Sequence, residues 1–515
     1  MNPHSRTYNS VKNSTVAIVF YIVNLLLQFV SRKIFIDQLG AELLGLNTTI
    51  VSIVQFLNIA ELGIGTAVAC TLYAPLSNRD QVAINEIVSL QGWLYKYIAF
   101  IIIGLSSVLL LFFPYILGNS NLPISYSYLT FVVMLFGSLI GYFVNYKQVL
   151  LSANQQEYKI QLSYKLTMLL KIVAQIVVVK LSENGYMWWL LMEVVFSILA
   201  TIALNISIKR TFPHLQTQTS RGAELRKKYP GVVRMTSQLF FHKIASFALT
   251  QFSPIVIYVY STLTEVTKYS NYMLVVTGVV SLLMAMFNGL NAGVGNLVAE
   301  NNMERIMKVF RELFSMRFVL VSVCSILIYV LLEPFISLWV GTEFLLDKST
   351  LLLIVVVFYI NAMRGVVDAF LQAYGLFKDI WAPIVEATLN IGLSFLLGYF
   401  MGLDGVLLGM IASLLVIVFL WKPYFLFSKG FKMPISIYVK MYAKHLLILA
   451  IVVTLLHFII PTLGICGESS WSKLLLDGVV LTLCSTLIIG SITYVFESGM
   501  RDFVKRVLNM LKIRR

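Results

Sequence analysis

The chain has 515 residues, of which 58% are apolar and only 12% are charged. Soluble proteins have roughly 45–50% apolar residues, glycine included, and about 25% charged residues, whereas the mean hydropathy of this chain is +0.84. No soluble fold has an interior large enough to bury this much apolar surface, which excludes soluble domains, a secreted disulfide scaffold and a nucleic-acid-binding globule. We therefore expect an all-α integral membrane protein with many spans.

Apolar windows of the length that a bilayer core requires recur along the whole chain. We predict about fourteen transmembrane helices, near residues 15–31, 43–73, 94–116, 127–147, 164–181, 187–208, 236–260, 271–298, 317–338, 350–372, 383–400, 404–428, 441–461 and 474–497. The second and eighth windows are long for a single span. Because the number is even, both termini lie on one side of the membrane.

Lysine and arginine decide which side that is. If the N-terminus is cytoplasmic, the inside segments hold 31 of the 39 basic residues and the outside loops hold six. We therefore place both termini in the cytoplasm. The net charge of +15 then faces the anionic cytoplasmic leaflet, and no nucleic acid is needed to explain it.

The two halves of the chain resemble each other at a constant offset. Residues 151–160 parallel residues 371–380, and Asn184-Gly185 matches Asp404-Gly405, both at an offset of 220. Six spans separate the copies, so they have the same orientation in the membrane, as parallel transporter repeats do. We predict two six-helix lobes, at residues 1–208 and 232–428, that are related by a pseudo-two-fold axis. A basic cytoplasmic linker at 209–231 joins them, and two additional helices with a basic tail follow at 429–515.

Polar residues inside six of the spans recur at spacings of three and four, so each set lies on one helix face. Examples are Ser163, Thr167, Lys171 and Gln175 in the fifth span, and Asn361, Arg364, Asp368 and Gln372 in the tenth. A charge at mid-bilayer costs roughly 3 kcal/mol or more and normally faces a bundle interior or a watery cavity. Both halves contribute such faces, which favours a shared central cavity.

A structural interpretation of the same residues stays open. Arg364 and Asp368 are four residues apart and can neutralise each other, and Lys171 can pair with Glu193. These pairs would then join helices without binding a substrate. Nucleotide-binding and catalytic patterns such as GxxxxGK[ST] and HExxH are absent from the sequence, so we predict no catalytic residue, metal or cofactor.

Two stretches near the start resemble a known family. The run from Arg32 to Leu46 and the segment Ile59-Ala-Glu61-Leu-Gly63-Ile-Gly65 are similar to the opening of bacterial polysaccharide flippases. These O-antigen and capsule flippases belong to the MATE-like MOP exporter superfamily. The resemblance implies two lobes that alternate access and move an undecaprenyl-pyrophosphate-linked oligosaccharide from the inner to the outer leaflet of the bacterial inner membrane.

The resemblance also suggests roles for residues. An anionic headgroup requires cations in the cavity, and the candidates are Arg32, Lys171 and Arg364. Ion or proton coupling requires carboxylates, whose pKa values shift when they are desolvated; the candidates are Glu61, Glu193, Asp368 and Glu386. A polysaccharide polymerase is a candidate partner. The sequence does not identify the glycan, which could belong to lipopolysaccharide O-antigen, capsule or peptidoglycan, and it does not give the oligomeric state.

Two other classes of protein remain as alternatives. A MATE-like ion-coupled exporter of small molecules usually has twelve spans and few cavity cations. A polytopic polysaccharide polymerase or glycosyltransferase needs a large outside loop or a soluble domain for its acceptor, and the sequence has neither. Both features favour the flippase.

Overall fold

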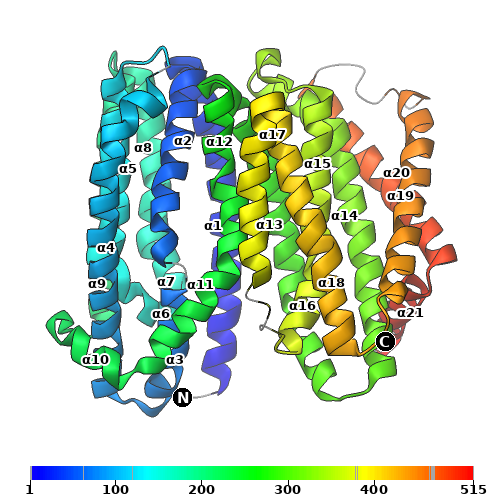
Figure 1. Ribbon diagram of the computed structural model, residues 1–515, viewed down its shortest axis with the longest axis horizontal. Coiled ribbons are helices and arrows are strands. Elements are labelled where there is room, and N and C mark those ends of the chain that lie inside the picture. Colours follow the sequence, from blue (N-terminus) through cyan, green and yellow to red (C-terminus); the bar gives the residue numbers. More distant parts are fainter. Residues whose placement is uncertain are drawn as a thin grey trace. The chain divides into compact units, whose positions relative to one another are not determined.

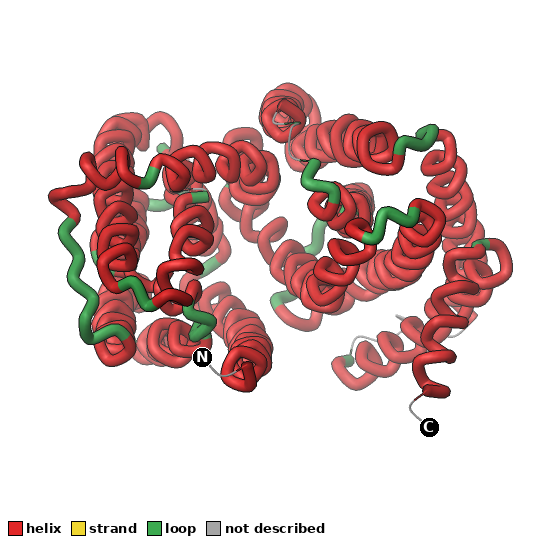
Figure 2. Tube along the Cα trace, turned by 90° about the horizontal axis from the view of Figure 1, so that it is seen from below, coloured by secondary structure: helices red, strands yellow, loops and turns green. Residues whose placement is uncertain are grey.

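A computed structural model describes residues 3–61, 63–118, 120–376, 379, 381–462, 464 and 470–513, with side chains except at 3–11, 60, 241–246, 248–250, 288–292 and 510–513. The described residues form helices joined by short loops, with no strand among them (Figures 1 and 2). Eleven helical segments in this part of the chain are long and apolar enough to cross a membrane. The expected all-helical membrane fold is confirmed.

The chain divides into two compact units, Met1–Thr267 and Lys268–Arg515. The main helices of the first unit are α1 (Pro3–Leu39), α2 (Ala41–Leu57), α3 (Ile64–Asn78), α4 (Gln81–Leu117), α5 (Ile124–Phe143), α6 (Val149–Ala153), α7 (Tyr158–Ile160), α8 (Leu166–Leu181), α9 (Gly185–Thr211), α10 (Gly222–Lys228), α11 (Pro230–Gln251) and α12 (Ser253–Tyr260). Short η segments join several of them: η1 (Asn58–Glu61), η2 (Asn145–Gln148), the π-helical η3 (Gln161–Lys165) and η4 (Thr219–Arg221).

Helix α13 (Leu263–Ala299) begins in the first unit and continues into the second. The second unit then contains α14 (Met303–Trp339), η5 (Thr342–Phe344), α15 (Lys348–Met363), α16 (Gly365–Ala373), α17 (Trp381–Leu414), α18 (Lys422–Phe425), α19 (Ser436–Thr462), α20 (Trp471–Phe496) and α21 (Ser498–Ile513). Two π-helical segments, η6 (Leu415–Trp421) and η7 (Leu426–Phe431), flank α18.

The fourteen predicted windows fall on helix, but three of them are interrupted. The window at 43–73 is broken into α2, η1 and α3, where Gly63 adopts a φ of 101°. The window at 236–260 is broken between α11 and α12, where Pro254 stands in the first turn of α12. The window at 350–372 is broken at Arg364, between α15 and α16. The windows at 383–400 and 404–428 are separated by a kink at Gly402, with a φ of 56°, where the sequence also places the boundary. Glycine and proline, which hydropathy does not detect, set the first two of these breaks.

The start of one long helix in each unit repeats the same local structure at an offset of 222. Asp80 precedes α4 and accepts a hydrogen bond at 3.0 Å from the amide three residues later, as Asn302 does before α14. The residues before these caps, Arg79 and Asn301, have φ values of 56° and 55°. The two helices that follow are each 37 residues long. An N-cap after a left-handed residue therefore starts the same helix in both halves.

A turn is also repeated between the two halves, at an offset of 220 residues. Gln155 has a φ of 57° and Gly375 a φ of 64°. The next amide in each copy, that of Gln156 or Leu376, donates to the carbonyl five residues back, at 2.8 and 2.9 Å. The sequence repeat is thus also a repeat of backbone structure. The division into lobes at residues 209–231 stays a prediction.

The predicted linker lies along the start of α4. Alternate linker residues bond to side chains four residues apart on α4, because two extended residues and four helical residues both advance about 6 Å. The bonds are Gln81 Nε2 to His214 O at 3.3 Å, Gln216 N to Asn85 Oδ1 at 3.1 Å, and Gln218 N to Ser89 Oγ at 2.8 Å.

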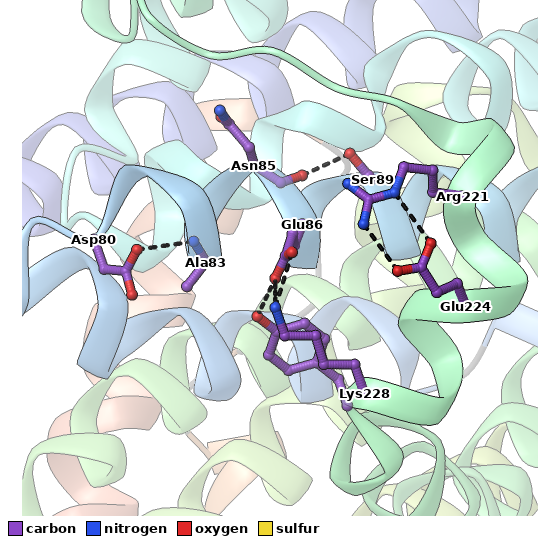
Figure 3. A network of polar contacts seen from close by, with 9 residues as sticks. Asp80, Ala83, Asn85, Glu86, Ser89, Arg221, Glu224 and Lys228 are labelled. Carbon is purple, nitrogen blue, oxygen red and sulfur yellow. Dashed lines mark hydrogen bonds and ion pairs between the residues drawn. The ribbon is translucent and has the colours of Figure 1, made fainter.

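Ionic contacts hold the end of the linker to the same helix (Figure 3). Glu86 Oε2 lies 2.7 Å from Lys228 Nζ and accepts a hydrogen bond at 2.6 Å from the Tyr229 hydroxyl. Glu86 precedes the predicted span at 94–116, and its bonds with Lys228 and Tyr229 lower the pKa of its carboxyl. A Cβ on Gly222 would lie 1.9 Å from Trp93 Cγ, so only glycine permits this approach. The linker is therefore an integral part of the first unit.

Candidate functional site

A charged network in the first unit joins α8 to α9. Lys171 Nζ lies 2.5 Å from Glu193 Oε1, and Gln175 Nε2 donates to Glu193 Oε2 at 3.0 Å. Gln175 Nε2 also donates to the Trp189 carbonyl at 3.2 Å. The side chains of Lys171 and Glu193 are both only 16% exposed. The network is therefore electrically neutral and largely buried.

The sequence explains why these groups meet. Lys171 and Gln175 are four residues apart and share one face of α8. Helices α8 and α9 are separated only by residues 182–184, so they are neighbours in the bundle and pack against each other. Glu193 on α9 then faces both side chains. The pairing of Lys171 with Glu193, one of the two interpretations that the sequence left open, is what the structure contains.

A larger charged network lies in the second unit. Arg364 stands at the break between α15 and α16, where its Nε lies 2.9 Å from Asp368 Oδ2 and its Nη1 lies 3.4 Å from Glu386 Oε1. Lys422 Nζ on α18 is 2.8 Å from Asp368 Oδ1. The Glu386 side chain is only 1% exposed, while the other three are 14–26% exposed. Two cations and two carboxylates, from the α15–α16 break and the helices α16, α17 and α18, thus form one connected group.

A third cation lies beside this network. Arg317 on α14 is 7% exposed, its Nε donates to the Ala362 carbonyl, and its guanidinium lies 4.3 Å from the centroid of the Phe287 ring. A Cβ on Gly365 would lie 2.4 Å from Arg317 Nη2. Arg317 therefore packs against the break in the tenth span, and glycine at position 365 provides the space for it.

Sequence reasoning missed Arg317 and Lys422 as members of a site. Both stand at the edges of apolar windows, where charge counting treats them as loop cations. Lys422 follows the π-helical η6, which shifts the side-chain register relative to a regular helix. Gly365, next to Arg364 in the tenth predicted span, was the signal in the sequence that could have indicated a close neighbour such as Arg317.

The other two predicted residues lie elsewhere in the first unit. Glu61 is in η1, and its Oε1 accepts a hydrogen bond from the Tyr95 hydroxyl at 2.8 Å. Arg32 is half-buried in α1, which packs against α8. Five of the seven predicted residues therefore lie in the two networks. No group of three or more possible metal ligands occurs in the part of the chain that the structure describes.

Two apolar grooves lie in the second unit. One, with a volume of about 550 Å³, is lined by residues of α14, α15, η6 and α19, among them Tyr329, Tyr359, Phe419, Tyr442 and Leu456. The other has a similar volume and is lined by α13, α14 and α20. Helices α19 and α20, the additional pair that the sequence predicts, each form a wall of one groove.

Comparison with known proteins places the fold. No protein-family model and no curated protein sequence matches the chain. Among solved structures, the lipid II flippase MurJ in an inward closed conformation matches with a TM-score of 0.66 at 15% identity, over 95% of this chain and 100% of that chain. An inward-facing multidrug resistance MATE family transporter of the MOP superfamily matches with a TM-score of 0.61 at 14% identity. This chain has the MOP fold.

The extent of the matches differs between the two kinds of MOP structure. The MATE family transporter covers 83% of this chain and 99% of its own. The Vibrio cholerae MATE transporter VcmN also covers 83%, with a TM-score of 0.53 at 13% identity and 99% of that chain covered. A larger share of this chain thus corresponds to MurJ than to the MATE transporters.

Proposed function

We propose that the chain is a flippase that moves an undecaprenyl-pyrophosphate-linked oligosaccharide from the inner to the outer leaflet of a bacterial inner membrane. The observation that carries this proposal is the match to the lipid II flippase MurJ over 95% of the chain, against 83% for MATE transporters. In this proposal the lobes at 1–208 and 232–428 alternate access between the two sides of the membrane. A polysaccharide polymerase that uses the flipped unit is the proposed partner.

The charged networks supply the chemistry for an anionic headgroup. Arginine binds phosphate through two parallel hydrogen bonds, and a cation in a low-dielectric site binds it more strongly than one in water. In this proposal Arg364, Lys171 and Arg32 contact the pyrophosphate. Arg364 and Lys171 are held ready by carboxylates, so the headgroup binds by displacing Asp368 and Glu193 as their partners.

The same carboxylates provide the proposed coupling. When Asp368, Glu386 or Glu193 takes up a proton, it loses the charge that holds its cation, and the cation becomes available for phosphate. Loss of the proton restores the ion pair and expels the headgroup. Glu61, bonded to Tyr95, is a fourth candidate for this role.

The polyprenyl tail needs a different environment from the headgroup. The two grooves in the second unit are lined almost entirely by apolar side chains and include the additional helices α19 and α20. A groove of this kind keeps an isoprenoid chain in contact with apolar groups while the sugar passes through water. We assign the tail to the α14–α15–α19 groove.

A second candidate function is export of small molecules coupled to an ion gradient. It is favoured by the TM-score of 0.61 to a multidrug resistance MATE family transporter. The two functions differ in what accumulates when the protein is missing.

Deletion of the gene tests the proposed function. A flippase deletion should leave a lipid-linked oligosaccharide in the inner leaflet, and the wild-type gene should clear it. The control is a gene carrying Arg305→Ala, which removes an exposed ion pair with Glu300 and should also clear the lipid. Unchanged lipid-linked sugars together with a gain of sensitivity to toxic cations would support the exporter instead.

A further inference from the structure

The C-terminal helix α21 begins directly after the span α20, with only Glu497 between them. Its sequence has apolar residues at 500, 503, 504, 507, 508 and 511, which is a continuous stripe on one helix face. The stripe is half-buried at its start, but Val507 is 38% and Leu508 52% exposed. An amphipathic helix at the end of a span, with part of its apolar face uncovered, has the pattern of a helix that lies in the membrane surface.

Two ion pairs and a close backbone approach fix α21 against the start of α14. Arg506 Nη2 lies 2.9 Å from Glu312 Oε2, whose side chain is buried, and Lys308 Nζ lies 3.8 Å from Asp502 Oδ1. A Cβ on Gly499 would lie 2.4 Å from the Arg311 carbonyl oxygen. The helix is therefore held in one place beside a membrane span.

Cations from three helices surround the break between α20 and α21. Arg311 of α14, Lys444 of α19 and Arg501 of α21 all interact electrostatically with the carboxylate of Glu497, which is 8% exposed. All three cations are exposed, and so is Lys505 one turn further along α21. One buried carboxylate cannot neutralise three cations, so this surface carries a surplus of positive charge where a span ends.

We propose that Arg311, Lys444 and Arg501 bind the phosphate of an anionic phospholipid headgroup, while Val507 and Leu508 insert into the bilayer surface beside it. The charge surplus selects anionic over zwitterionic lipid, because each cation near an anionic membrane surface contributes favourably. The exposed apolar pair selects a lipid over a free phosphate ion. The site is separate from the charged networks within the spans and does not depend on what the protein transports.

Binding of short-chain phosphatidylglycerol to the full chain in neutral detergent tests the site. Phosphatidylglycerol should raise the melting temperature, whereas phosphatidylcholine and inorganic phosphate should not. The triple variant Arg311→Gln/Lys444→Gln/Arg501→Gln should bind phosphatidylglycerol at least about tenfold more weakly, since each cation near an anionic surface is worth roughly fivefold in affinity. The matched control Arg226→Gln/Lys227→Gln removes exposed cations of α10 and should bind as the wild type does.

Glu497→Gln distinguishes a lipid site from cations that only neutralise a carboxylate. The variant keeps the three cations and removes the carboxylate, so phosphatidylglycerol should bind more tightly. Unchanged affinity of Glu497→Gln, equal losses in the triple variant and its α10 control, or equal stabilisation by inorganic phosphate would each overturn the proposal.

A spin label tests the apolar part independently of affinity. In a cysteine-free chain reconstituted in vesicles containing phosphatidylglycerol, a label at Leu508→Cys should collide more often with oxygen than with a water-soluble nickel complex. A label at the neighbouring exposed Asn509→Cys should show the opposite preference. Equal access of nickel to both labels would place α21 in water and overturn the proposal.

Discussion

The Lys171–Glu193 pair offers a test of how the first unit is held together. Lys171→Met leaves the carboxylate with only Gln175 as a partner, and Glu193→Gln leaves an ammonium group without a counter-ion. Removing one partner of a buried ion pair destabilises a protein by about 3–5 kcal/mol. Because both side chains keep 16% exposure, we expect about 3 kcal/mol for each single variant, at the lower end of that range.

The double variant Lys171→Met/Glu193→Gln leaves no unpaired charge. Replacing a whole buried pair by neutral groups is often close to neutral in stability, so the double variant should lie within about 1 kcal/mol of the wild type. The coupling energy between the two positions is then large and measurable by unfolding the purified protein in mixed micelles of increasing SDS content.

Additive effects in this cycle would refute the reasoning. Single variants that each cost less than about 1 kcal/mol would show that water or another group already compensates the charges. The control is the exposed pair of Lys33 and Asp37, which lie 3.5 Å apart on α1. Its coupling should be about 0.5 kcal/mol or less, as for surface pairs.

Four further predictions follow from the same contacts. Arg364→Ala should abolish glycan export while the protein still reaches the membrane, whereas Arg305→Ala should leave export unchanged; pulse-labelled glycan and immunoblots measure both. Gly365→Ala should destabilise the second unit by about 1–3 kcal/mol, because the added methyl overlaps a buried guanidinium, and SDS unfolding measures this. The bonds of Glu86 lower its pKa, so its contribution is present above its usual pKa and is lost as the pH falls through the lowered value; Glu86→Gln should remove that part of the acid dependence in melting curves. A reporter fused at Arg221 should report the cytoplasm, and an outside signal would overturn the charge-based topology.

The spans were predictable because lipid imposes a single rule on every residue within it. A window must be apolar and about twenty residues long, and each predicted window falls on helix. The breaks were not predictable from hydropathy. Gly63 and Pro254 interrupt helices within continuous apolar runs, because a local backbone angle or a missing amide group determines the break.

The candidate site was predictable only where its partners are linked by helix geometry. Arg364 and Asp368 share a helix face, and Lys171 and Glu193 sit on helices joined by a short turn. Lys422 joins the network of Arg364 and Asp368 from a distant part of the sequence, after a π-helical segment. Arg317 comes from another distant part and packs beside the network, against Gly365. The spacing of residues along the sequence does not predict these contacts of Lys422 and Arg317.

The structure of the linker at 209–231 was also only partly predictable from the sequence. Its basic composition predicts a cytoplasmic loop but does not reveal that alternate residues bond to Gln81, Asn85 and Ser89. The polar spacing of four on α4 is visible in the sequence. Its partner is an extended segment some 130 residues later, and only the fold brings the two together.

Transfer of a fluorescent undecaprenyl-pyrophosphate oligosaccharide across the bilayer of proteoliposomes tests the central claim most directly. If the purified protein is a flippase, dithionite added outside should quench the label in both leaflets with wild-type protein, and only that of the outer leaflet with Arg364→Ala or in empty vesicles. Quenching that stops at the outer leaflet with the wild-type protein, under an imposed membrane potential and a proton gradient of either sign, would contradict the account.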